Sequence, residues 1–347
     1  MDDPVYTQRP IQSIESLCCA LGQTEGFLRS MADRIPKLYI GPMPKPKKNG
    51  NGFRNVYDTK APLKLLLKKI NVVFFKKVDF PLYLQGSLQG RDYVSNASIH
   101  RGSGVVISED IQKFFDNIAA EQVYAIWHDF FRFGAEPAAL LTALTTREGR
   151  VFQGTPTSSY LANLVFWGIE GKVVEKLARR GIRYSRYVDD VTISHETAIS
   201  PEDKTWAIAQ IYAMVGARGF KPERSKHSVQ PAHRRISVMG INVNQHPTIS
   251  VAERAKLRSE VHRLEDLFDR SETGLEFRGA LEKASGKIGR MSRFHSDEAA
   301  ALRQRVRSMR RAFDSLPCAT FATTTFPAIS GHLDQASPPD CLDTPPW

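Results

Sequence analysis

Two adjacent aspartates, Asp189 and Asp190, join two short stretches of β-forming residues. The flanking segments 182–187 and 191–194 contain mainly β-branched, aromatic and basic residues, which predicts a hairpin with both carboxylates at its tip. Adjacent carboxylates repel one another, so the pair is costly unless a cation balances it. The alternative is an acidic surface turn, because Asp is common in turns where it bonds its own backbone.

A third carboxylate, Asp110, ends the β-rich stretch Val105–Asp110. In a strand, Val106, Ser108 and Asp110 share one face, so Asp110 can point into a cleft while its apolar neighbours pack behind it. One carboxylate from this strand and two from the hairpin can bind two Mg²⁺ ions about 4 Å apart, the arrangement used for in-line phosphoryl transfer. These residues therefore predict the chemistry of a nucleotide polymerase.

Three blocks, in this order, resemble motifs A, B and C of a reverse transcriptase, in particular of bacterial enzymes of the retron type. They are Asp110–Phe115, Gln153–Ser158 and Tyr187–Asp190. A further signature, Asn96-Ala97-x-x-His100, precedes the first block as it does in retron-type enzymes. At the expected primer grip those enzymes usually carry Val-Thr-Gly, whereas this chain has Val238-Met239-Gly240.

The resemblance implies how the reaction centre is built. Asp110, Asp189 and Asp190 would hold two Mg²⁺ ions, with the backbone carbonyl of Ile111 as a further ligand. Lys226, in a block that resembles motif D, would act as general acid toward the departing pyrophosphate, although an ordinary surface lysine is the alternative.

The resemblance also implies how nucleotide and template are bound. Phe115 would lie beneath the sugar of a deoxynucleoside triphosphate, where its ring would collide with a ribose 2′-OH. Lys47 and Arg54, in a basic segment with Asn-Gly pairs that predicts a hairpin, would neutralise the triphosphate, unless this charge run is a solvated face. Gln153 would bond near the template base or sugar, and Gly154 would let the backbone approach the nucleotide.

The expected partner is a structured non-coding RNA that serves as both template and primer and yields an RNA–DNA hybrid. Enzymes of this type start from a guanosine 2′-OH of their own RNA and leave a branched RNA-linked DNA. Asn96 and His100 are expected to contact the RNA, and Arg303, Arg307 and Arg310 to hold duplex phosphates. An effector protein and a role in phage defence are further expectations of the resemblance.

Composition agrees with a nucleic-acid partner. The 347 residues are 41% hydrophobic, enough for a sizeable core, and the formal net charge of +11 favours a polyanion. No run of 18 apolar residues occurs, and the first residues lack the features of a signal peptide, so we expect a cytoplasmic protein without membrane contact. The four cysteines have no metal-ligand spacing and are expected to be reduced thiols.

Apolar spacing predicts the helices around the motifs. Two short helices are expected in 11–35, one in 59–78, two in 120–146, one in 201–219 and three in 250–314. After the Gly154 turn, the apolar positions Leu161, Leu164, Val165 and Ile169 predict a single helix.

The expected fold class is α+β, a right-hand polymerase with fingers, an antiparallel palm sheet and a helical thumb. The expected parts are an N-terminal helical segment (1–35), fingers (36–104), palm (105–248), thumb (249–316) and a disordered tail (317–347).

Three alternative functions remain beside the retron reading. An RNA-dependent RNA polymerase commonly has Gly before the two aspartates, so Val188 and Phe115 argue against it. A non-catalytic nucleic-acid-binding protein with a polymerase fold would bury three carboxylates without a metal, which is costly. Another bacterial reverse transcriptase, either defence-associated or derived from a group II intron, stays open.

Overall fold

The structure is a computed structural model that describes residues 3–46, 52–271, 273 and 276–315. Lys47 and the tail 317–347 lie outside the described residues. The chain divides into two compact units, Met1–Val251 and Ala252–Trp347, and each is described by itself.

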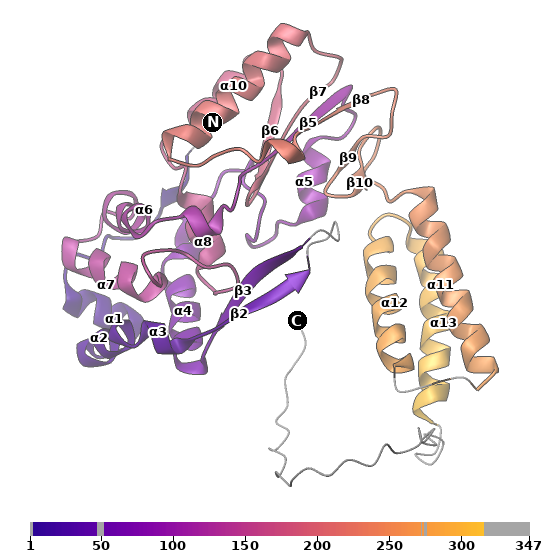
Figure 1. The fold of residues 1–347 in the computed structure, drawn as a ribbon, viewed down its shortest axis with the longest axis horizontal. Helices are drawn as coiled ribbons and strands as arrows, with labels where there is room; N and C mark the ends of the chain where they lie inside the picture. Colours follow the sequence, from indigo (N-terminus) through magenta and orange to yellow (C-terminus); the bar gives the residue numbers. More distant parts are fainter. Residues whose placement is uncertain (1–2, 47–51, 272, 274–275, 316–347) are drawn as a thin grey trace, which may run out of the picture. The chain divides into compact units, whose positions relative to one another are not determined.

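A four-stranded antiparallel sheet forms the centre of the first unit (Figure 1). Its order is β6 (Arg183–Tyr187), β7 (Asp190–His195), β5 (Val105–Asp110) and β8 (Ser228–Pro231). The predicted hairpin is confirmed, because Tyr187 pairs with Asp190 across a two-residue turn. Strand β7 also pairs with β5, with Asp190 directly opposite Asp110. Carboxylates from separate segments therefore meet at one end of the sheet.

Helices of the first unit pack on this sheet and on one another. Helix α9 (Glu170–Ala178) contacts β6, α10 (Pro201–Ala217) contacts α9, and α5 (Tyr93–Ile99) contacts β6. Their inward residues, among them Leu177 and Ile211, are almost fully buried. This apolar core holds the sheet rigid beneath its carboxylate end.

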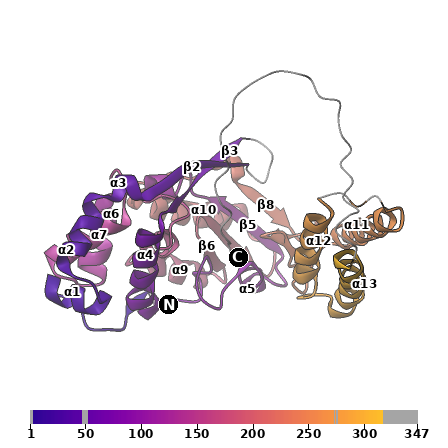
Figure 2. The ribbon, with the colours of Figure 1, turned by 90° about the horizontal axis from the view of Figure 1, so that it is seen from below.

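A second group of elements lies at the N-terminal side of the first unit, where α1, α2 and α7 lie side by side (Figure 2). Side-chain oxygens of Ser13 and Thr24 cap α1 and α2, which confirms both predicted helices. The elements here are α1 (Ile14–Leu21), α2 (Glu25–Asp33), α3 (Ile35–Leu38), the hairpin β2 (Tyr39–Pro46) and β3 (Phe53–Thr59), α4 (Ala61–Val73), α6 (Ala120–Ala125), the π-helical turn η3 (Ile126–Phe130) and α7 (Ala135–Thr145).

Short elements complete the first unit. They are β1 (Val5–Tyr6) paired with β4 (Val78–Asp79), the 3₁₀ turns η1 (Phe75–Lys77), η2 (Phe115–Asn117) and η4 (Arg224–Lys226), and the hairpin β9 (Ser237–Val238) and β10 (Ile241–Asn242). Met239 and Gly240 form the two-residue turn of that hairpin with φ of 52° and 76°. Positive φ at both turn residues is typical of tight hairpins.

The predicted helix after Gly154 is shorter than its apolar pattern indicates. Helix α8 (Ser158–Leu164) ends before Val165, and Ile169 is the N-cap residue of α9. Between them Gly168 has φ of 76°, a left-handed conformation that interrupts a right-handed helix. The apolar spacing correctly predicted that Leu161, Leu164 and Val165 are buried, but not that the helix ends before Ile169.

The second unit contains the three helices predicted for 250–314. They are α11 (Val251–Asp269), α12 (Phe277–Met291) and α13 (Ser296–Asp314) (Figure 2). Each contributes an apolar stripe, for example Val261, Leu281 and Val306, to a common core. No helix in the described ranges is both long and apolar enough to cross a membrane.

Candidate active site

Three carboxylates from two segments of the chain gather at one end of the central sheet. Asp110 ends β5, Asp190 begins β7, and Asp189 occupies the turn before it. The amide of Ile111 donates to the carbonyl of Asp189 at 3.1 Å, so the chain beyond β5 is fastened to the hairpin turn. The structure thus brings together the three aspartates that the sequence singled out.

The local environment opposes full ionisation of these carboxylates. Burial, followed by the charge of Asp110, raises the pKa of Asp189, while Lys226 and Arg54 oppose the rise. Burial, followed by the charges of Asp189 and Asp110, raises the pKa of Asp190 to about 7. Such a cluster is stabilised by any cation that enters it.

Lys226 provides the cation that the carboxylates hold in this structure. Its Nζ lies 2.6 Å from Oδ2 of Asp110, and its side chain is 56% exposed, whereas that of Asp110 is only 7% exposed. The next residue is fastened in the same way, since His227 Nδ1 lies 2.6 Å from Oε1 of Glu109. The adjacent residues Glu109 and Asp110 of β5 therefore bind the adjacent residues His227 and Lys226 at the end of η4. The sequence did not predict the Glu109–His227 pair.

The donors of this cluster fit a hard divalent cation in kind. They are carboxylate oxygens, the ligands that Mg²⁺ prefers, and their mutual repulsion would fall on cation binding. Within the described ranges, no group of three or more His, Cys, Asp or Glu side chains is already arranged as a metal site. One oxygen of Asp110, Oδ2, is instead occupied by the ammonium of Lys226.

The β2–β3 hairpin carries the predicted phosphate-binding cation. Arg54 is exposed on β3, and its guanidinium acts on the pKa of Asp189 as described above. Lys45 lies directly opposite Arg54 on β2, so both side chains share one face of the hairpin. Lys47 lies outside the described residues, and Lys45 is the described lysine in register with Arg54. Sequence reasoning missed Lys45 because cross-strand register was not known.

The turn of Gln153 and Gly154 docks against β3. The amide of Tyr57 donates to the carbonyl of Gln153 at 2.8 Å. Gly154 has φ of 114°, and a Cβ on it would lie 2.1 Å from the carbonyl oxygen of Tyr57. Only glycine fits this close backbone contact between the turn and the hairpin.

The two phenylalanines after Asp110 differ in burial. Phe114 is 2% exposed and stacks on Phe166 with ring centroids 5.9 Å apart, so its ring belongs to the core. Phe115 begins η2 and is half-buried, so part of its ring remains accessible to a ligand.

The structure corrects the expected RNA contact of Asn96 and His100. Asn96 is 1% exposed and His100 is 0% exposed, so neither side chain reaches the surface. His100 lies between two strands, with Nδ1 and Nε2 each 2.8 Å from the hydroxyls of Ser194 and Ser185. Burial and, less strongly, Arg183 lower the pKa of His100 to about 3, so the ring is neutral and joins β6 to β7.

The predicted phosphate-binding arginines lie on α13 of the second unit. Arg303, Arg307 and Arg310 follow one another at helical spacing on one face. Arg307 is exposed, and no acidic partner within the described ranges lies at ion-pair distance from Arg303 or Arg307. Arg305 differs, because its Nε donates to Oε1 of Glu265 at 2.7 Å.

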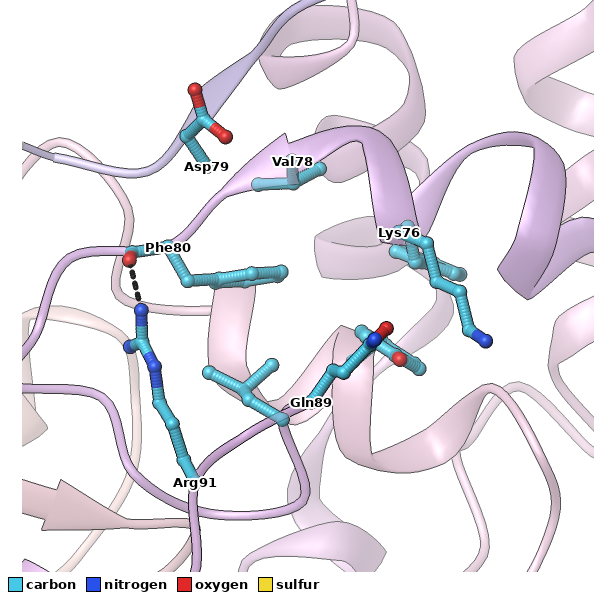
Figure 3. Close-up of a pocket in the computed structure, with 9 residues that line it drawn as sticks. Lys76, Val78, Asp79, Phe80, Gln89 and Arg91 are labelled. Carbon is cyan, nitrogen blue, oxygen red and sulfur yellow. Dashed lines mark hydrogen bonds between the residues drawn. The ribbon is translucent and has the colours of Figure 1, made fainter. Parts of the chain in front are cut away.

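A pocket of about 360 Å³ lies in the first unit (Figure 3). Phe75, Phe80 and Tyr160 form much of its apolar lining, with Lys76 and Gln89 among its polar residues. None of the predicted site residues lines it. Arg91 also lines the pocket, and its Nη2 donates to the carbonyl oxygen of Phe80 at 2.5 Å.

Comparisons with known proteins identify the family. The family model for reverse transcriptase (RNA-dependent DNA polymerase) matches residues 45–243. The retron Se72 reverse transcriptase of Salmonella heidelberg is 32% identical over 309 residues, covering 87% of this chain and 81% of that protein. The retron Ec48 reverse transcriptase of Escherichia coli is 28% identical over 316 residues, covering 87% and 77%.

A solved telomerase from Candida albicans, in complex with a fragment of telomeric RNA, is 10% identical with a TM-score of 0.43, covering 84% of this chain and 66% of that one. This likeness is too slight to support the assignment further. The family match spans more than half of the chain and contains all three carboxylates, and the curated relatives extend over most of its length. The chain therefore belongs to the reverse transcriptases, and within them it is an RNA-directed DNA polymerase of the retron type.

Proposed function

We propose that this reverse transcriptase adds deoxynucleotides at the cluster of Asp110, Asp189 and Asp190, and that these residues, with the carbonyl of Ile111, hold two Mg²⁺ ions. Reverse transcriptases generally use divalent metal ions; the identity and number of the ions are part of the proposal. The observation that carries it is the register that sets Asp110 directly opposite Asp190, with Asp189 in the adjoining turn.

The chain's own residues have distinct roles in this proposal. When bound, the metal ions activate the primer hydroxyl and neutralise charge on the transferring phosphoryl group. Arg54 and Lys45, on one face of the β2–β3 hairpin, bind the triphosphate of the incoming deoxynucleotide. Lys226, once released from Asp110, donates a proton to the departing pyrophosphate. In this proposal Arg54, Lys45 and Lys226 together neutralise the negative charge of the triphosphate and of the departing pyrophosphate.

The substrate-binding surfaces follow the same arrangement. Phe115 lies beneath the nucleotide sugar with its accessible ring edge, and Gln153 and Gly154 bind near the template nucleotide. The docking of that turn on Tyr57 supports this placement, because it joins the template side to the triphosphate side.

The polymerase fold is proposed to be a right hand. The N-terminal helical segment is 1–35, the fingers are 36–104, the palm is 105–248 and the thumb is 249–316. Support comes from the antiparallel carboxylate-bearing sheet in 105–231 and from the separate compact unit that begins at Ala252. Arg303, Arg307 and Arg310 would hold the phosphates of the RNA–DNA hybrid through non-specific charge contacts.

The template is RNA, and we propose that one structured non-coding RNA supplies both template and primer. The curated relatives of this chain are named as retron reverse transcriptases, which supports a cognate RNA. An effector protein, a role in phage defence and a cytoplasmic site of action complete the proposal and rest on the family alone.

The carboxylate assignment is tested by Asp189→Asn and Asp110→Asn in primer extension on poly(rA) with oligo(dT) and Mg²⁺. Each substitution removes a metal-binding charge but leaves the basic surfaces, so DNA synthesis should be lost while RNA binding persists. Lys204→Gln, at a partly exposed position near the start of α10, is the control and should extend normally. Wild-type extension by either aspartate variant rejects the assignment.

A further inference from the structure

Arg186 is a buried cation next to the turn formed by Val188 and Asp189 (the catalytic turn). Its side chain is 0% exposed, so the guanidinium has no contact with water and its charge must be balanced within the protein. The carboxylate of Glu170, itself 2% exposed, pairs with it in a bidentate manner, with Nε–Oε1 at 2.7 Å and Nη2–Oε2 at 2.8 Å. Glu170 also accepts the hydroxyl of Tyr184 at 2.7 Å. The pair is neutral as a unit and fully enclosed.

The remaining donors of Arg186 all bind backbone carbonyls. Nη1 lies 2.9 Å from the oxygen of Val188 and 3.3 Å from that of Ala162, and Nη2 lies 3.0 Å from that of Asn163. With the two bonds to Glu170, all five guanidinium N–H groups are used. Ala162 and Asn163 belong to the last turn of α8, whose carbonyls have no partner within the helix. One side chain thus joins the helix that follows Gly154 to the catalytic turn.

The turn itself requires such support. Val188 has φ of 63°, a left-handed conformation that is strained for a β-branched residue. The carbonyl that Arg186 binds belongs to the peptide between Val188 and Asp189. Fixing this peptide plane fixes the direction in which the chain enters Asp189.

The segment before α5 closes on the same turn. Gln85 donates to the carbonyl of Arg186 at 2.9 Å, and the amide of Arg186 donates to Tyr83 at 2.8 Å. A Cβ on Gly86 would lie 2.4 Å from Cγ2 of Val188, so this backbone touches the turn directly. Arg91 in turn holds the segment by bonds to the carbonyls of Phe80 (Figure 3) and, at 2.6 Å, Leu84.

We propose that Arg186 and Glu170 form a positioning pair, which holds the Val188–Asp189 peptide against α8 so that Asp189 and Asp190 are preorganised as metal ligands. This inference rests on the proposed function of those aspartates. The pair acts through geometry, because the guanidinium charge is balanced by Glu170 within hydrogen-bond distance. A small displacement of a ligand is sufficient to cost much of the rate.

The decisive variant is the double substitution Arg186→Met with Glu170→Met. Removing both members leaves no unpaired buried charge, so the domain is expected to fold, as far-UV circular dichroism and thermal denaturation would show. Single-nucleotide addition should slow by about 100-fold. The Mg²⁺ concentration at half-maximal rate, and the Kd for Mn²⁺ of the free protein by electron paramagnetic resonance, should each rise by about tenfold. RNA affinity should not change.

Two further variants separate positioning from general stability. Tyr184→Phe removes a bond to Glu170 without touching the turn, and it should keep the wild-type Mn²⁺ affinity. Gly86→Ala displaces Val188 while the pair stays intact, and it should weaken Mn²⁺ binding as the double variant does. If the double variant is not recovered folded, Arg186→Lys, which keeps a charge beside Glu170 but has too few donors for Val188 and α8, takes its place.

Two results distinguish the failure of this inference from failure of the proposed function. A folded double variant with wild-type Mn²⁺ affinity and Mg²⁺ dependence overturns the positioning role, while Asp189→Asn remains inactive in the same assay. DNA synthesis by Asp189→Asn at the wild-type rate overturns the catalytic assignment itself, whatever the double variant does.

Discussion

At the scale of single residues, neighbouring groups decide which role a side chain can have. Asp110 and Glu109 are successive residues of one strand, yet Asp110 binds the exposed Lys226 and Glu109 binds His227 and the hydroxyl of Tyr212. Both oxygens of Glu109 are thereby engaged, whereas the one cationic partner of Asp110 is 56% exposed. In the proposed function, Asp110 is the carboxylate that exchanges this partner for a metal ion.

Phe115 is expected to exclude ribonucleotides. Its half-buried ring would meet the 2′-OH, the group that separates the two kinds of nucleotide. Phe115→Ala should raise ribonucleotide incorporation relative to deoxynucleotide incorporation in single-nucleotide extension, whereas Phe114→Leu, in the core, should leave the ratio unchanged. An unchanged ratio in Phe115→Ala places the sugar discrimination elsewhere.

His100 is expected to make the protein acid-sensitive. Its pKa is about 3 in the folded state and 6.5 without perturbation, so between these values the unfolded chain binds a proton that the folded chain does not. The contribution is complete above pH 6.5 and is lost as the pH falls toward 3, which amounts to about 2 kcal/mol between pH 7.5 and 5.

His100→Gln removes this difference in proton binding. In urea unfolding the variant should be less stable than wild type at pH 7.5, because the hydroxyls of Ser185 and Ser194 lose their partner. It should lose less stability than wild type on going to pH 5. Equal losses of stability in variant and wild type would contradict a neutral buried ring. A loss of RNA affinity in the folded variant would instead support the prediction that His100 contacts RNA.

At the scale of elements, the Gly154 turn docks on the β2–β3 hairpin through Tyr57. Gly154→Ala combines a strained φ with a clash against the carbonyl of Tyr57, so it should lower stability by about 1–3 kcal/mol and raise the KM for deoxynucleotides. Gly149→Ala is the matched control, because φ there is 72° but nothing lies within 4 Å of the added Cβ. Thermal denaturation and steady-state kinetics compare the two. Equal effects would mean that strain alone, not docking, matters.

Local patterns were enough to predict most elements, but not the contacts between them. The hairpin at Asp189 and the helices of 250–314 follow from residue type and apolar spacing, which act within a short window. The burial of His100 depends on serines 85 and 94 residues away, and the pairing of Lys45 with Arg54 depends on strand register. Neither is encoded in a short window, so a signature read as RNA-binding proved to be a link between strands.

At the scale of the whole molecule, the reverse transcriptase family and its retron relatives predict a dedicated RNA. Expression of the chain with its native flanking DNA should yield a short single-stranded DNA joined to RNA. Its mobility should change on RNase treatment and on debranching, since the proposed primer is a guanosine 2′-OH. Asp189→Asn, expressed from the same DNA, should yield none.

Met239 stands where retron enzymes usually have Thr, yet it occupies a hairpin turn at positive φ, a conformation set by the backbone. Met239→Thr should therefore leave the yield of this DNA nearly unchanged. If no branched DNA forms while the purified enzyme extends a generic primed template, the chain copies RNA without a cognate RNA of its own.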